Sequence, residues 1–143
     1  MRSRPPITEV AAVLPAVLVV LVRLRWLHPR SDMRTLVGAV TVGSGGAPMR
    51  PSHAQTAVRL AGAIVRRLPR VFPQACLYWS LAGCHFLRRA GRSPVIHVGV
   101  RLQDGEMLSH AWLTVDGEVL VGQPDPDDYT EMLTFPDRFG PSP

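Results

Sequence analysis

Lysine is absent from this sequence of 143 residues, so all 16 basic residues are arginine, against 11 aspartates and glutamates. The formal net charge of +5 predicts only a weak preference for acidic partners. The arginines stand singly or in short pairs such as Arg66-Arg67, without interleaved aromatic residues and without a zinc-finger or RNP pattern. Because those features mark nucleic-acid binding, we expect no nucleic-acid partner.

Cysteine is also scarce, since the chain has only Cys76 and Cys84. If both lie on one helix, their Cα atoms are about 12 Å apart, too far for a disulfide. We therefore expect two free thiols in a reducing compartment, which favours a cytoplasmic protein. The adjacent Cys84-His85 lacks metal-ligand spacing and no second ligand pair follows, so we expect neither a metal site nor a cofactor.

No apolar run is long enough for a standard membrane span. The longest, Val10 to Val22, has 13 residues and includes Pro15, whereas a spanning helix needs about 20. The run is preceded and followed by arginines, but no small-residue cleavage site of a signal peptide comes after it. A buried helix is the favoured interpretation. Contact with a membrane surface, and a signal or anchor, are the less favoured alternatives.

The chain divides near its glycine-rich stretch into two sections of one compact domain. Residues 1–50 form an N-terminal helical section, with a helix from Val10 to Trp26, and end in the loop that starts at Gly43. Residues 51–143 form the main body, which opens with a helix capped by Ser52. A second helix, opened by Pro73 and stopped at Gly91, is apolar nearly all round and is therefore expected to be buried.

Short apolar runs separated by turn signals follow these helices. The runs Val95 to Leu102, Met107 to Val115 and Val119 to Val121 are separated by Asp104-Gly105 and Asp116-Gly117. Asp-Gly is typical of two-residue hairpin turns, so the pattern predicts a three-stranded antiparallel meander. The proline-rich tail contains one further element, near Tyr129 to Leu133. Helices followed by antiparallel strands make the fold class α+β.

Cys76 and His110 are the candidate catalytic pair. Cys76 lies in the first turn of its helix, where backbone N–H groups and the helix dipole favour the thiolate. His110 lies in the second strand of the meander, and a cysteine at a helix N-terminus facing a histidine on a sheet is the papain-like arrangement. The competing interpretation is that Cys76 is a small buried hydrophobe, which is how we interpret Cys84.

His97 and Trp112 lie on the same face of the predicted sheet as His110 and are the other residues expected at the cleft. With a two-residue turn, His97 pairs with Trp112 and His110 pairs with Gly99 on the same face of the sheet. Gly99 would leave open space beside His110. His97 is either a cleft-lining residue or a packed one, and Trp112 is a core residue first and a peptide contact second.

Together these residues look like a known family. Cys76-Leu77 followed by Ser80-Leu81, the strand Gly99-Val100-Arg101, and His110-Ala111-Trp112 followed by Val115-Asp116-Gly117 resemble the stand-alone B2 leader peptidase of lasso-peptide biosynthesis. That family has a transglutaminase-like fold. The resemblance implies a cysteine peptidase that removes the leader of a ribosomally made precursor peptide. It also implies two partner proteins, a separate leader-recognition protein and a ring-closing synthetase.

The third member of a triad is the point at which the sequence departs from this family. The family's acid lies in the strand after the histidine, where this chain has Gly122. Asp125 is the first candidate, because a carboxylate stabilises the imidazolium, and Gln123 is an alternative acceptor or substrate contact. The missing acid leaves open a non-catalytic scaffold that binds the precursor and the partner enzymes. Acyl transfer to an amine instead of water is open as well.

Overall fold

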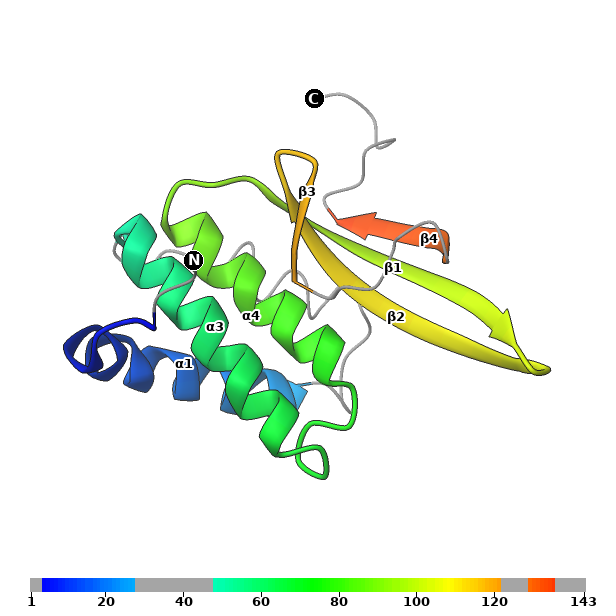
Figure 1. The fold of residues 1–143 in the computed structure, drawn as a ribbon, viewed down its shortest axis with the longest axis horizontal. Coiled ribbons are helices and arrows are strands. Elements are labelled where there is room, and N and C mark those ends of the chain that lie inside the picture. Colours follow the sequence, from blue (N-terminus) through cyan, green and yellow to red (C-terminus); the bar gives the residue numbers. More distant parts are fainter. Residues whose placement is uncertain (1–3, 28–47, 122–128, 136–143) are drawn as a thin grey trace.

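The computed structural model of the protein describes residues 4–27, 48–121 and 129–135, which form a layer of helices on one side of an antiparallel sheet (Figure 1). The helices are α1 (Ile7–Leu27), α3 (Pro51–Arg67) and α4 (Ala75–Arg89). The strands are β1 (Pro94–Gln103), β2 (Glu106–Val115), β3 (Glu118–Val121) and β4 (Thr130–Phe135), in the spatial order β3-β2-β1-β4. The predicted α+β class is confirmed.

Helix α1 buries one stripe and leaves its opposite side exposed. It is longer than predicted, and Pro15 stands inside it on the exposed side, where its ring disturbs no packing. The stripe repeats every three or four residues and belongs to the same core as α3, α4 and the sheet; its members are Val13, Val17, Leu21 and Leu24. The expectation of a buried helix therefore holds for one face of α1 only. Within the described ranges, α1 alone has the length and apolar composition of a membrane-crossing helix.

Helix α3 begins one residue earlier than its expected cap. Arg50 is the N-cap residue and Pro51 occupies the first turn, so the prediction of Ser52 as the cap was wrong. Proline is well suited to the first turn because the N–H it lacks has no helical partner there. Further along α3, Gly62 lets the helix approach Trp79 of α4, whose indole N–H donates to the Val58 carbonyl oxygen at 2.8 Å.

Helix α4 begins at Ala75 and not at Pro73 as predicted. Leu77 and Tyr78 both donate their backbone N–H groups to the carbonyl oxygen of Gln74, the N-cap residue. At the other end, the Arg92 N–H bonds back to the Leu87 carbonyl oxygen at 2.9 Å across Gly91, whose φ is +81°. This is a Schellman C-cap, and it explains why a glycine ends this helix.

The two Asp-Gly turns form as predicted and set the register of the sheet. Asp104 and Gly105 have φ of 53° and 81°, and Asp116 and Gly117 have φ of 54° and 82°. Two-residue hairpin turns of type I′ require such positive values at both central residues. The resulting pairs include His97 with Trp112, as predicted. The tail element is strand β4, which pairs with the outer edge of β1 and gives the sheet a fourth strand.

The helices cover the aliphatic face of the sheet. A Cβ placed on Gly83 of α4 would lie 3.0 Å from Leu113 Cδ2, and Leu113 belongs to the common core together with Ala111 and Val115. Successive side chains of a strand point to opposite faces. The even-numbered residues of β2, among them His110, Trp112 and Thr114, therefore lie on the face away from α4.

Candidate functional site

Cys76 is the second residue of α4, where it is partly buried and packs against the common core. Because Leu77 and Tyr78 make the first helical hydrogen bonds, the N–H groups of Ala75 and Cys76 stand ahead of the hydrogen-bond ladder. The side chain of the N-cap residue Gln74 makes no capping bond. The chemical surroundings expected of a nucleophile, partial exposure and a helix N-terminus, are both present at Cys76.

His110 is held in a stack of aromatic rings. Its ring centroid is 6.1 Å from that of Trp112 and 5.2 Å from that of Tyr129, with interplanar angles of 20° and 29°. The Arg101 guanidinium lies over the Tyr129 ring, 5.0 Å from the ring centroid. The stack restricts the orientation of the His110 imidazole.

The open space expected at Gly99 is not there, so that prediction was wrong. A Cβ on Gly99 would lie 3.0 Å from Trp112 Cη2 and 3.0 Å from the Thr130 carbonyl oxygen. The edge of the indole fills the volume that a side chain at Gly99 would occupy. The glycine therefore lets Trp112 lie flat across β1, where it contacts both histidines.

His97 is buried, and both of its ring nitrogens have partners. Nδ1 pairs with the Glu131 carboxylate of β4, and Nε2 lies 2.8 Å from Thr114 Oγ1. The ring also stacks on Trp112, parallel to within 3°. Of the two interpretations that the sequence leaves open, this environment favours a packed residue that ties β4 to β1 and β2.

Tyr129, Glu131 and Thr114 are the residues of this cluster that sequence reasoning missed. Thr114 was recognisable, because it follows Trp112 by two residues and must share its face. Tyr129 and Glu131 had no such signal, since their place depends on the pairing of β4 with β1.

The structure gathers the predicted residues into two groups. His97, His110 and Trp112 lie together on one face of the sheet, whereas Cys76 is carried by the helix that covers the other face. Asp125 and Gln123 fall outside the described residues. Within the described ranges, no group of three or more histidine, cysteine or acidic side chains has the arrangement of a metal site.

Cys84, which follows Cys76 on α4 by eight residues, is a core residue as predicted. It is 1% exposed, and burial raises the pKa of its thiol to about 11, an effect that the nearby Arg88 only partly offsets. A thiol of this kind is protonated at neutral pH and has no access to a substrate. Cys84 is therefore a matched control for experiments on Cys76.

Comparison with known proteins identifies this arrangement of helices and strands. A family model described as the transglutaminase-like superfamily matches residues 18–134, from the middle of α1 to the end of β4. The chain belongs to the transglutaminase-like superfamily. Membership agrees with the α+β class, and the superfamily includes cysteine peptidases. A search of curated proteins and a search of solved structures each returned no match.

Proposed function

We propose that this transglutaminase-like protein is a cysteine peptidase that removes the leader from a lasso-peptide precursor before ring closure. Cys76 is the nucleophile and His110 the general base and acid. The observation that carries the proposal is the place of Cys76, a partly exposed thiol in the first turn of α4 within a superfamily that includes cysteine peptidases. The peptide substrate, the leader-recognition protein and the synthetase follow from the resemblance of the sequence motifs.

The chemistry is acyl transfer through a thioester. The Cys76 thiolate attacks the scissile carbonyl carbon, and His110 protonates the departing amine. Water, deprotonated by His110, then hydrolyses the thioester and frees the leader. The Cys76 N–H at the helix N-terminus stabilises the oxyanion, and the uncapped side chain of Gln74 is a second donor for it.

This mechanism sets a structural condition, because the two side chains must meet within hydrogen-bonding distance. His110 lies on the face of the sheet away from α4. The proposal therefore requires that binding of the precursor or the leader-recognition protein bring Cys76 and His110 together.

The position of His110 on the face of the sheet away from α4 favours a second candidate function. A scaffold that binds the precursor and its partner enzymes without cutting needs no contact between Cys76 and His110. It also needs no acid at Gly122, where the family places one. In this alternative the aromatic stack around His110 has a structural role.

The deciding experiment is mass spectrometry of the precursor after incubation with its leader-recognition protein and one variant of the chain. The variants are the native protein, Cys76→Ala, His110→Gln and the control Cys84→Ala. We expect the native protein and the control to cut at one bond, and the other two to leave the precursor intact. Circular dichroism checks that each variant is folded.

Each alternative gives a different result. Cleavage by Cys76→Ala at the native rate would remove catalysis from this residue and refute the peptidase mechanism. Absence of cleavage by any variant, with the precursor still bound by the native chain, would support the scaffold. Release of the leader as an amide of an added amine would show acyl transfer instead of hydrolysis.

A further inference from the structure

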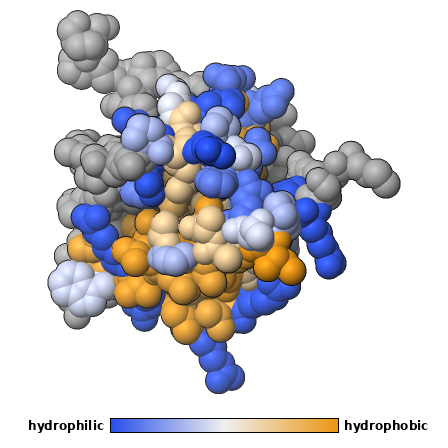
Figure 2. Space-filling model, turned by 90° about the vertical axis from the view of Figure 1, so that its left-hand side faces the viewer, coloured by the Kyte–Doolittle hydropathy of each residue, from blue (hydrophilic) through white to orange (hydrophobic). Residues whose placement is uncertain are grey.

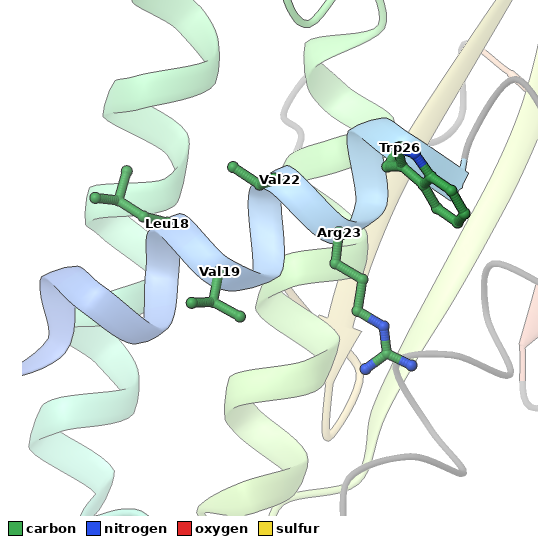
Figure 3. Close-up of a pocket in the computed structure, with 5 residues that line it drawn as sticks. All are labelled: Leu18, Val19, Val22, Arg23 and Trp26. Atoms are coloured by element: carbon green, nitrogen blue, oxygen red, sulfur yellow. The ribbon is translucent and has the colours of Figure 1, made fainter.

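The outer side of α1 is an apolar surface that the described residues do not cover. Figure 2 shows apolar side chains gathered on this side of the molecule, with hydrophilic ones around them. Val19 and Val22 are each 66% exposed and Trp26 is 60% exposed. With Leu18 and Arg23 they line a shallow groove (Figure 3). We name this surface, from Leu14 to Trp26, the outer face of α1.

The charges of the helical layer to which this face belongs are almost all positive. The described helices and their connecting turns, residues 4–27 and 48–91, contain ten arginines and a single carboxylate, Glu9. Glu9 lies 3.9 Å from His53. Most acidic residues of the described chain lie instead on the sheet and its turns: Asp104, Glu106, Asp116, Glu118 and Glu131. The molecule is therefore electrostatically polarised, with its apolar helix on the positive side.

The turn between α3 and α4 continues the outer face at the C-terminal end of α1. The Arg25 side chain donates to the Val71 carbonyl oxygen at 2.7 Å, which fixes this turn beside α1. Leu68 and Val71 of the turn are exposed, and Arg70 lies between them. Aliphatic side chains next to arginines and a tryptophan are typical of helices that lie in a membrane interface.

The packing of α1 decides how it can meet a bilayer. Val17 and Leu21, the centre of the buried stripe, are 0% and 1% exposed in the core shared with α3 and α4. If α1 crossed the membrane, it would have to leave this core and expose the apolar residues beneath it. A helix that lies flat keeps its core contacts and buries only the outer face.

We propose that the outer face of α1 binds the surface of an anionic membrane, with α1 parallel to the bilayer plane. The aliphatic side chains enter the boundary between headgroups and acyl chains, and the surrounding arginines contact the lipid phosphates. A second copy of this chain fits less well, because two surfaces rich in arginine repel each other. The inference does not depend on the proposed peptidase activity.

The test is flotation of the full chain with vesicles of phosphatidylcholine alone or mixed with phosphatidylglycerol. We expect binding to the mixed vesicles, and expect it to weaken as salt rises from about 0.15 M to about 1 M. The double variant Val19→Gln, Val22→Gln should bind at least about tenfold more weakly, because two partly inserted aliphatic side chains are lost. The matched control is Leu102→Gln, Met107→Gln, which changes residues that are 74% and 72% exposed on the hairpin.

The control variant should bind like the native chain, and circular dichroism should show that all variants are folded. Equal binding by the native chain and the α1 variant would overturn the proposal, as would absence of binding to the mixed vesicles. Dimerisation of the native chain without lipid, lost in the α1 variant, would assign the face to a second copy instead.

Discussion

The two cysteines of this chain should differ in their rate of alkylation. In native protein at about pH 8, iodoacetamide is expected to modify Cys76 and to leave Cys84 free. The pKa of Cys84 is raised from 9.0 to about 11 by burial. At about pH 8 its thiolate fraction is therefore about one in a thousand, against about one in ten without the shift. Ionisation alone slows the labelling of Cys84 about a hundredfold, and its exposure of 1% slows it further.

The assay is a time course of labelling followed by peptide mapping, which measures the modified fraction at each cysteine. In concentrated urea both cysteines should react at similar rates, because unfolding removes the burial that protects Cys84. The reasoning is refuted if Cys84 of the folded protein reacts as fast as Cys76. Complete labelling of Cys76 should also abolish cleavage of the precursor, whereas a scaffold would keep its binding.

Three further predictions concern stability. As the pH rises from about 9 to about 11, the unfolded state loses the Cys84 proton before the folded state does, so up to about 3 kcal/mol of stability should be lost. Urea titrations at each pH measure this loss, and Cys84→Ala should make the free energy of unfolding less dependent on pH in this range. Gly62→Ala places a Cβ 2.4 Å from Trp79 Cε2. We therefore expect the free energy of unfolding in urea to fall by about 1–3 kcal/mol and the tryptophan fluorescence to shift to the red. An unchanged urea midpoint would contradict the close packing. Glu131→Leu removes the partner of His97 Nδ1 and should cost about 1–3 kcal/mol, with a change in the His97 ring signals by NMR. The control is Glu106→Leu, which changes the exposed first residue of β2.

The parts of the fold that depend on local chemistry were predictable. Both Asp-Gly turns need positive φ at both central residues, which these residue types tolerate, and the turns then fixed the pairing of His97 with Trp112. The glycine at position 91 likewise marked the end of α4, because the Schellman cap needs a left-handed residue there.

Two features of the fold could not be predicted from the sequence: the residue at which α4 begins and the partner of β4. The first turn of α4 starts at Ala75 because the Gln74 carbonyl accepts the first helical bonds, and a proline at 73 could not reveal this shift. The partner of β4 is set by the Glu131 contact with His97, between residues 34 positions apart in the sequence. No periodicity in the sequence encodes such a contact.

The face on which His110 lies could have been deduced, and it constrains the proposed mechanism. A helix that is apolar nearly all round covers the more aliphatic face of its sheet, which in β2 is the face of Ala111, Leu113 and Val115. A one-residue slip of β2 would turn His110 toward α4, but it would also move those three side chains out of the core and onto the opposite face of the sheet. The core therefore excludes a slip as the route to a Cys76–His110 pair. The first turn of α4 is the cheaper place for a rearrangement, because Cys76 is partly buried there and its N–H precedes the hydrogen-bond ladder. If the protein is a peptidase, binding of its substrate or partner must act on this turn.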